Sequence, residues 1–561
     1  MTRGRGGRAA ATVVVVTACL SWPVVAAAAD RPSEADLFGG ASAGADGGAP
    51  ASAAAATGGG DADGGPPSVS PAAPVAPIPA TAPPSSVADP AAAPSRDDAV
   101  LGDPKAGPKL SVDVAPDDPL RIGGQLYLRA AAQATQGQAL GSIRASAPAL
   151  VDAYFDARPN DRVRAFVLGR LFFDPTLPTT GAPLDFTSSM SGTSVSTATA
   201  VPLLSGTQST RGPNSVLDQM WLRFDVKRTL FITAGRQHVK WGTGRFWTPT
   251  DYLHPQRRNP VAAFDARPGF TMLKVHAPWE ERGWNFYAFG LVEGTPVLDS
   301  TGRYPAGSDG ASTLGRMGGA ARAELVLGTA ELGLDAVVYH GQKPRFGGDL
   351  SFGIGDFDLY VDAGLRYGSE LPRRGYDPSA VDDTTKTLVQ RIDARYPYEP
   401  AIGVKPQVTV GGTYQLRYND NDVFTVTGEY FYNSRGYNDP RVYPGLFLTN
   451  TFEFFYTGRH YAALGAILAA PWSWNYTTFS FTTLGNLSDQ SFISRLDYSL
   501  VLLTHLRFEA FGAVNYGRRE GEFRLGVKEI TVPDPLVLGG TRTIKQEPQS
   551  FSVGLGLRVS L

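Results

Sequence analysis

Apolar and polar residues alternate in a recurring pattern from residue 109 to residue 561. Each repeat has about 9–13 residues of alternating character and ends in a turn, and a strand that crosses a bilayer needs about 9–11 residues. The pattern predicts an all-β fold, an antiparallel transmembrane β-barrel of about 18 strands (16–18). The strands are expected near 122–133, 148–157, 162–173, 215–226, 229–239, 270–277, 283–292, 316–327, 329–340, 345–353, 356–366, 407–418, 422–433, 458–469, 475–486, 491–502, 504–516 and 550–561.

The last of these segments shows the two faces most clearly. Phe551, Val553 and Leu555 fall on one face, whereas Ser552 and Gly554 fall on the other. One face suits lipid and the other suits water. A soluble β-sandwich gives the same alternation with its apolar face turned inward, so the pattern alone leaves both orientations open.

The lengths of the connections favour a membrane barrel. Connections after even-numbered strands are short, and those after odd-numbered strands are mostly long, with exceptions at 341–344 and 487–490. Short periplasmic turns and long outer loops are typical of bacterial outer-membrane barrels. An even number of strands places both the N-terminal tail and the C-terminus in the periplasm. A final strand at the chain end predicts recognition by the barrel-assembly machinery, although Leu561 stands where Phe is most typical.

Two segments of different composition precede the predicted barrel. Residues 1–29 combine early arginines, an apolar run and small residues before Asp30, which predicts a secretory signal peptide. Lipidation at Cys19 is the alternative. Residues 30–108 are rich in Ala, Pro and Gly and predict a disordered periplasmic linker. This linker is expected to be a spacer, or else a tether to the cell wall or to a periplasmic partner.

Charge and cysteine content narrow the function classes. The 561 residues include 51 Lys and Arg against 53 Asp and Glu, a formal net charge of −2. This balance argues against a nucleic-acid partner. A single cysteine, Cys19, excludes an internal disulfide and a cysteine-rich metal site. No metal and no cofactor is expected.

The polar faces of the strands supply the candidate lumen lining. A barrel of 16–18 strands leaves an aqueous lumen unless loops fill it. Arginines and acidic residues are nearly balanced on these faces, which predicts weak charge selectivity or cross-strand ion pairs that stiffen the wall. The lumen-lining candidates are Arg129, Arg164, Arg170, Arg223, Arg366, Arg417, Arg507, Asp358, Asp362, Glu429 and Glu509.

One segment, residues 235–260, differs from the rest in its density of aromatic and basic residues. Gly242 and Gly244 allow a tight bend after the strand, and three prolines oppose regular structure. Three locations remain open: a constriction inside the lumen, a structural latch on the inner wall, or a surface epitope. The constriction or solute-binding candidates are Arg236, Lys240, Trp241, Arg245, Trp247, Asp251, Arg257 and Arg258.

The same segment carries a family resemblance. Its run Gly-Arg-Gln, Trp-Gly, Phe-Trp and Pro-Thr-Asp resembles the signature of a porin-like outer-membrane barrel family of Gram-negative bacteria, a family of largely unknown function. The chain is more loosely similar to alginate-export-type barrels. The resemblance implies an outer-membrane location and a transport or structural role, and it implies no particular substrate. A polysaccharide exporter is expected to have a strongly basic lumen, which the balanced charges do not favour.

Catalytic patterns are weak in this sequence. It has six histidines and no Gly-x-Ser-x-Gly or His-Glu-x-x-His run, so an enzyme is not expected. The sequence favours an outer-membrane channel for passive diffusion of small hydrophilic solutes, in contact with membrane lipid and lipopolysaccharide. The alternative is a non-conducting structural or surface-interaction barrel that is plugged by its long loops.

Overall fold

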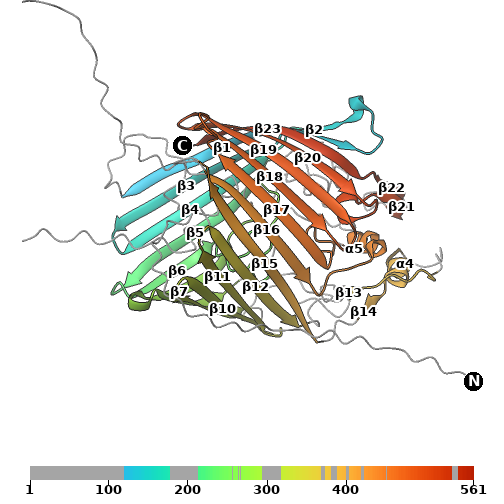
Figure 1. Ribbon diagram of the computed structural model, residues 1–561. Helices are drawn as coiled ribbons and strands as arrows, with labels where there is room; N and C mark the ends of the chain where they lie inside the picture. The colour runs from blue at the N-terminus through green and yellow to red at the C-terminus, as the bar shows by residue number, and fades with distance from the viewer. Residues whose placement is uncertain are drawn as a thin grey trace, which may run out of the picture.

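The computed structural model describes residues 119–176, 213–254, 257–262, 265, 267–292, 317–340, 342–367, 373–380, 388–399, 403–418, 423–449, 451–533 and 541–560. The predicted signal peptide and the predicted linker lie outside these residues, as does Leu561. The described part of the chain forms one closed antiparallel barrel, whose strands tilt across the molecule in Figure 1.

Eighteen strands make up the barrel wall in the described residues, and their bounds differ from the predicted ones by three residues or fewer. They are β1 (Leu120–Thr135), β3 (Ala149–Asn160), β4 (Val163–Phe173), β5 (Asn214–Val226), β6 (Leu230–Gln237), β7 (Phe270–Trp279), β8 (Trp284–Leu291), β9 (Gly318–Leu327), β10 (Ala330–Tyr339), β11 (Arg345–Ile354), β12 (Phe357–Tyr367), β15 (Val404–Arg417), β16 (Val423–Asn433), β17 (His460–Ala469), β18 (Thr477–Asn486), β19 (Ser491–Leu503), β20 (Leu506–Gly517) and β23 (Gln549–Ser560). A short strand that the pattern did not predict, β2 (Arg144–Ser146), extends the wall beside β1.

Each strand pairs with the next strand of the wall, and β23 pairs with β1 to close the barrel. The closing register runs from Gln125 opposite Ser560 to Thr135 opposite Gln549. Closure leaves no unpaired edge, so the backbone amides and carbonyls of the wall are satisfied by neighbouring strands. A polypeptide in lipid requires this arrangement.

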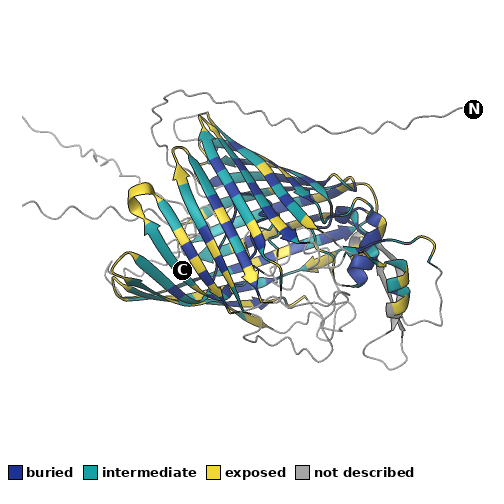
Figure 2. Ribbon diagram, turned by 90° about the horizontal axis from the view of Figure 1, so that it is seen from below, coloured by how far each residue is buried: buried dark blue, intermediate teal, exposed yellow. Residues whose placement is uncertain are grey.

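The apolar face of the wall points outward. On β23, Val553 is 47% exposed and Leu555 is 55% exposed, whereas the alternating Ser552 and Gly554 are buried. The same alternation of exposed and buried residues runs along the other strands in Figure 2. This orientation is opposite to that of a soluble sandwich, and it resolves the alternative that the sequence pattern left open.

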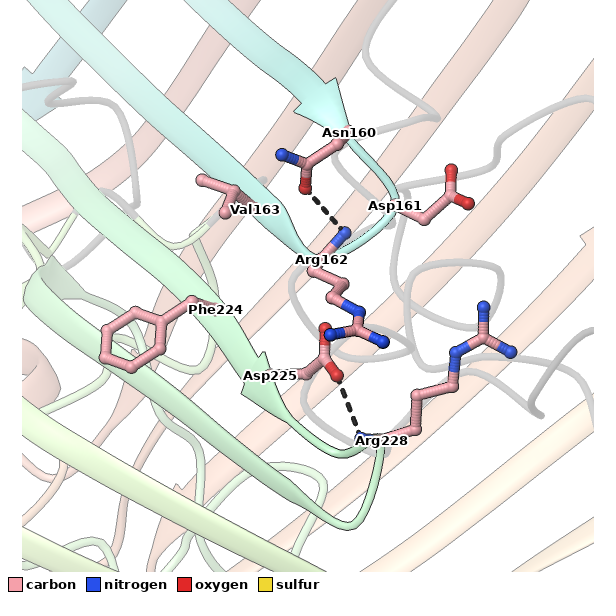
Figure 3. Close-up of a pocket in the computed structure, with 7 residues that line it drawn as sticks. All are labelled: Asn160, Asp161, Arg162, Val163, Phe224, Asp225 and Arg228. Atoms are coloured by element: carbon pink, nitrogen blue, oxygen red, sulfur yellow. Dashed lines mark hydrogen bonds between the residues drawn. The ribbon is translucent and has the colours of Figure 1, made fainter.

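The two ends of the barrel differ in their connections. At the short-turn end, neighbouring strands are joined by 161–162, 227–229, 280–283, 328–329, 355–356, 418–422, 470–476 and 504–505. Gly328 and Gly355 have φ values of 67° and 59° there, in the left-handed region that tight turns need. Figure 3 shows two of these turns, where Asn160 accepts a hydrogen bond from the Arg162 amide and Asp225 accepts one from the Arg228 amide. Because β1 begins and β23 ends at this end, both barrel termini lie there.

The smaller elements gather at the opposite end, which we call the long-loop end (Figure 1). They are α4 (Leu388–Arg395), α5 (Tyr443–Leu448), the hairpin of β13 (Arg373–Arg374) with β14 (Tyr398–Glu399), and the hairpin of β21 (Val527–Pro533) with β22 (Thr541–Gln546). Three single-turn helices among the described residues also lie there: η2 (Leu140–Ser142), η6 (Pro440–Val442) and η7 (Glu522–Arg524). A further one, η3 (Glu280–Arg282), lies in a short turn at the other end. No helix among the described residues has the length and hydropathy needed to cross a membrane.

Candidate functional site

The segment with the distinctive sequence lies inside the barrel. We call the described residues of 238–269, which join β6 to β7, the lumenal loop. Counted from β1 around the wall, β6 is the fifth of the eighteen strands, and the loop contacts β16, which is the thirteenth. These two strands are almost diametrically opposite, so the loop crosses the lumen.

A single carboxylate on the far wall holds the middle of the loop. Glu429 of β16 accepts hydrogen bonds from the backbone nitrogens of Arg245 (2.7 Å), Phe246 (3.2 Å) and Trp247 (2.7 Å). The hydroxyl of Tyr360 on β12 donates a fourth hydrogen bond to Glu429 at 2.9 Å. Three consecutive amides that point at one carboxylate form an anion-binding nest, and Glu429 is 4% exposed within it. The wall therefore holds the loop by the backbone nitrogens of the loop.

Trp247 is the aromatic anchor of the loop on that wall. Its ring stacks on Phe431 of β16, with centroids 5.6 Å apart and planes 15° apart, and it also contacts Tyr461 of β17. Its indole Nε1 donates a hydrogen bond of 2.9 Å to the carbonyl of Phe455. Trp247 is fully buried, so its ring is occupied by protein contacts.

A second contact ties the loop to β12. Thr250 donates from its backbone nitrogen and from its hydroxyl to the two oxygens of Asp362, at 3.2 Å each. Gly242 has a φ of 90°, and a Cβ there would collide with the Asp362 carboxylate and with the Thr250 hydroxyl. Glycine is required at this position by both backbone conformation and space.

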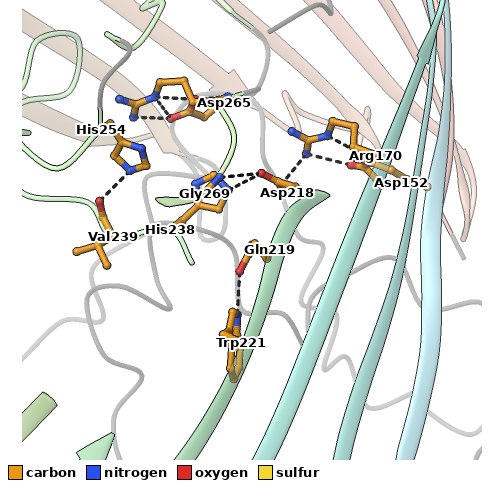
Figure 4. A network of polar contacts seen from close by, with 12 residues as sticks. Asp152, Arg170, Asp218, Gln219, Trp221, His238, Val239, His254, Asp265 and Gly269 are labelled. Atoms are coloured by element: carbon orange, nitrogen blue, oxygen red, sulfur yellow. Dashed lines mark hydrogen bonds and ion pairs between the residues drawn. The ribbon is translucent and has the colours of Figure 1, made fainter. Parts of the chain in front are cut away.

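The root of the loop is fixed by a polar network on β3, β4 and β5 (Figure 4). His238 Nε2 lies 2.8 Å from Asp218 Oδ1, and Asp218 also accepts a hydrogen bond from the Gly269 amide. Arg170 bridges Asp218 at 3.4 Å and Asp152 at 2.8 Å. The first and last residues of the loop therefore share one carboxylate.

An ion-pair group lies within the loop itself. Arg267 contacts Asp251 at 2.8 Å and Asp265 at 2.7 Å. Burial and the positive charge of Arg267 lower the pKa of the neighbouring His254 to about 4, so this imidazole is neutral at physiological pH. The rings of His238 and His254 are 5.8 Å apart, yet no group of side chains among the described residues is arranged to hold a metal ion.

The predicted constriction candidates fall into two classes of exposure. Trp241, Trp247 and Asp251 are buried against the wall or within the loop. The half-buried candidates are Arg236, Lys240, Arg245, Arg257 and Arg258. Arg245 lies 3.6 Å from Asp358 of β12, and Arg258 donates to the carbonyl of Arg245. The structure therefore brings the basic candidates together on the loop and directs both tryptophans into protein.

Most predicted lumen-lining residues point inward, and several of them form ion pairs. Arg170 pairs with Asp152, Arg164 with Asp156 at 2.8 Å, and Arg558 with Glu509 at 3.0 Å. Arg129, Arg366, Asp362 and Glu429 are buried, Arg223, Arg507 and Asp358 are half-buried, and Arg417 is exposed at the short-turn end of β15.

An arginine group at the long-loop end has a different character. We define it as Arg366 of β12 and the three arginines whose positive charges act on Arg366. These are Arg257 of the lumenal loop, Arg345 of β11 and Arg435 just after β16. The Arg366 guanidinium lies 4.8 Å from the Tyr252 ring centroid, and its Nε has no hydrogen-bond partner. Within the described part of the chain, neither Arg257 nor Arg366 forms an ion pair with a carboxylate. This group therefore concentrates positive charge near the loop.

Sequence analysis did not identify a second inward segment. Residues 434–459, between β16 and β17, pack on the lumenal loop through Phe455 and Tyr456, and the Tyr456 hydroxyl donates to the Arg258 carbonyl at 3.1 Å. Its aromatic run from Tyr443 to Tyr456 is a signal comparable to that of residues 235–260. Glu522 of η7, which contacts this segment, has no distinguishing local pattern in the sequence.

No protein-family model matches the chain, and a search of curated proteins gave no match. Among solved structures, the chain is similar to OccK8 (OprE) of Pseudomonas aeruginosa, with 11% identity and a TM-score of 0.43 over 79% of this chain and 98% of that one. It is also similar to OccAB3 of Acinetobacter baumannii, with 9% identity and a TM-score of 0.44 over 79% of this chain and 99% of that one. A third similar structure is OprB of Pseudomonas putida, with 9% identity and a TM-score of 0.41 over 79% of this chain and 94% of that one. The strand number and the closure of the barrel follow from this chain's own strand pairing.

Proposed function

We propose that this protein is an outer-membrane channel, not an enzyme, through which small hydrophilic solutes diffuse passively past a constriction formed by the lumenal loop. The observation that carries the proposal is the combination of an outward apolar face with a charged interior that one long loop crosses. An apolar exterior on a closed 18-strand barrel suits lipid, and a barrel of this size has room for an aqueous path.

The course of the path follows from which parts of the wall the loop covers. The loop packs on β7 to β10 through a hydrophobic cluster that includes Trp241 and Leu253, and on β16 to β19 through a second cluster that includes Phe246 and Trp247. The wall formed by β20, β23, β1, β3 and β4 carries half-buried charged residues instead, among them Arg164, Arg507 and Glu509. We place the solute path between that wall and the loop.

Weak charge selectivity is the expected property of this path. Charges that pair across strands, such as Arg558 with Glu509, offer a passing ion almost no net charge. The arginine group at the long-loop end adds a modest preference for anions at that mouth, because no carboxylate in the described residues pairs with Arg257 or Arg366.

The orientation in the membrane is part of the proposal. Both barrel termini lie at the short-turn end, which we assign to the periplasm together with the N-terminal linker, after removal of residues 1–29 as a signal peptide. Membrane lipid and lipopolysaccharide then contact the outward face. The barrel-assembly machinery is the expected partner of the C-terminal strand, and the linker is a spacer or a tether to the cell wall or to a periplasmic partner.

The alternative function is a non-conducting structural or surface-interaction barrel. The specific observation that favours it is the depth of loop packing: the lumenal loop and residues 434–459 share one buried cluster within the barrel. If that cluster extends across the whole lumen, no path is left.

Single-channel recording separates the two functions. The full chain is refolded, shown to be heat-modifiable, and inserted into planar bilayers, and its reversal potential is measured in a salt gradient. Steady openings with a reversal potential close to zero support the channel. A folded barrel that never conducts would overturn it in favour of the plugged barrel.

A further inference from the structure

Two buried carboxylates meet at the long-loop end, outside the strands. Asp489 lies in the turn between β18 and β19, and Glu522 lies in η7, and we call them the carboxylate pair. Both are 0% exposed. The side-chain Nδ2 of Asn486 donates to Asp489 Oδ2 at 2.9 Å and to Glu522 Oε2 at 2.8 Å, so one donor group contacts both acids. Neither carboxylate forms an ion pair with a cation in the part of the chain that the structure describes.

Hydroxyl groups complete the surroundings of the pair. Tyr443 of α5 donates to Asp489 at 2.9 Å, and Tyr461 of β17 donates to Glu522 at 2.5 Å. Asp489 also accepts from Ser491 and from the backbone nitrogen of Glu522. The titratable groups that face Glu522 are therefore Asp489, Tyr443 and Tyr461. Two adjacent buried carboxylates without a cation repel each other when both are ionised, and a proton on one of them removes that cost.

The pair is connected to the lumenal loop by hydrogen bonds. Glu522 accepts from the backbone nitrogen of Phe455, and the carbonyl of Phe455 accepts from the indole of Trp247. Phe455 has a φ of 69°, an unfavourable backbone conformation for a side chain of this size. Such a conformation persists only where its surroundings hold it, and here the bond to Glu522 does so. Release of Phe455 therefore removes one support of Trp247.

We infer that the carboxylate pair is a proton-controlled clasp, which seats residues 434–459 against the lumenal loop while it holds a proton and releases them when both carboxylates ionise. The clasp would let a rise in pH widen the path that the lumenal loop narrows. Its effect on conductance rests on the proposed channel function, whereas its effect on the seating of Phe455 does not.

The electrostatics give the direction and the pH window. Burial, followed by the charge of Asp489, raises the pKa of Glu522 to about 8, and burial also raises the pKa of Asp489. In a released, solvated state Glu522 returns toward its ordinary value of 4.5. Because the seated state binds the proton more tightly, the equilibrium constant for seating is highest below pH 4.5. This constant falls about tenfold per pH unit from there up to about pH 8, and above that pH it is constant.

Hydrogen exchange of the full chain in detergent tests the clasp. The protection factor of the Phe455 amide, corrected for intrinsic exchange rates, is measured from pH 5 to pH 9 in the native protein and in Glu522→Gln. We expect the native factor to fall about tenfold per unit up to about pH 8 and then to level off, and the Gln variant to show no such fall. Glu520→Gln, an exposed acid in the same segment, is the matched control and should follow the native protein.

A second variant and a second readout keep the outcomes distinct. Asp489→Asn removes the charge that raises the pKa of Glu522, so the fall should level off at a lower pH. Single-channel conductance over the same pH range should rise in the native protein and stay constant in Glu522→Gln. A protection factor that is independent of pH in the native protein, or that falls equally in the native protein and Glu522→Gln, overturns the clasp. If protection depends on pH in a barrel that never conducts, the channel function is overturned and the clasp is supported.

Discussion

The Oε1 atom of Glu429 lies 2.7 Å from the backbone nitrogen of Trp247, although 182 residues separate the two in the chain. Glu429 is on the wall and Trp247 is in the middle of the lumenal loop, so this bond marks the place where the loop reaches the far side of the barrel. The three loop amides use both oxygens of this carboxylate as acceptors. A neutral side chain of the same size, such as glutamine, has only one acceptor oxygen.

Glu429→Gln tests this anchor. Glutamine offers one acceptor oxygen, so at least one buried loop amide loses its partner, which costs about 1–3 kcal/mol. We expect the variant to fold and to lose that amount of stability, measured by urea titration of the heat-modifiable form. Glu281→Gln, an exposed acid in a short turn, is the control and should leave stability unchanged. Equal stability of the native protein and Glu429→Gln would contradict an anchoring role.

Trp247 and Arg245 separate the latch role of the loop from its constriction role. Trp247→Ala removes a buried ring and its hydrogen bond to Phe455, which is expected to cost about 3–5 kcal/mol. Arg245 is half-buried, so Arg245→Ala should cost much less and instead change the conductance. Both variants are measured for stability and for single-channel conductance. A loop that acts only as a latch would leave the conductance of Arg245→Ala at the native value.

Gly242→Ala is expected to displace the loop from β12. The new methyl group would meet Asp362 and Thr250 in a backbone conformation that alanine adopts poorly. We expect lower stability together with a larger or less steady conductance. Gly428→Ala on β16 is the matched control, because a Cβ there meets no atom within 4 Å. If both alanine variants behave as the native protein does, the close packing at Gly242 has no functional consequence.

The arginine group predicts an effect on ion selectivity. Replacing Arg257 and Arg366 together by glutamine removes two positive charges that form no ion pair with a carboxylate among the described residues. The reversal potential in a salt gradient should therefore shift toward cation preference. Arg228→Gln, which lies in a short turn at the other end of the barrel, should have a smaller effect. An unchanged reversal potential in the double variant would place the arginine group away from the ion path.

The lumenal loop should weaken around His254 in acid, a pH dependence opposite in direction to that of the carboxylate pair. Burial and the charge of Arg267 lower the pKa of His254 to about 4 from its ordinary 6.5. The unfolded or released state binds this proton more tightly, so the stabilisation is present above pH 6.5 and is lost as the pH falls toward 4. Hydrogen exchange of residues 250–254 should therefore accelerate between pH 6.5 and pH 4, beyond its intrinsic dependence. His254→Gln should abolish that acceleration.

The wall of the barrel was predictable because its determinants are local. Each strand pairs with its neighbour in the chain, so side-chain alternation, turn residues such as Gly328, and the lengths of the connections together specify the strand number and the antiparallel order. The pattern also identified residues 235–260 as unusual. It did not predict β2 or the two small hairpins within the long loops, because such short strands hold too few residues to show a period.

The tertiary structure alone decided where the long loops lie and which charges meet. An alternating strand by itself is compatible with either orientation. The connection lengths favoured the outward apolar face, and the structure shows it, with Leu555 of β23 55% exposed. The contacts of Trp247 with Glu429 and Phe455 join segments about two hundred residues apart. Glu522 and Asp489 become a pair only when two separate connections pack together. Such contacts depend on three-dimensional proximity, which the local sequence pattern does not encode.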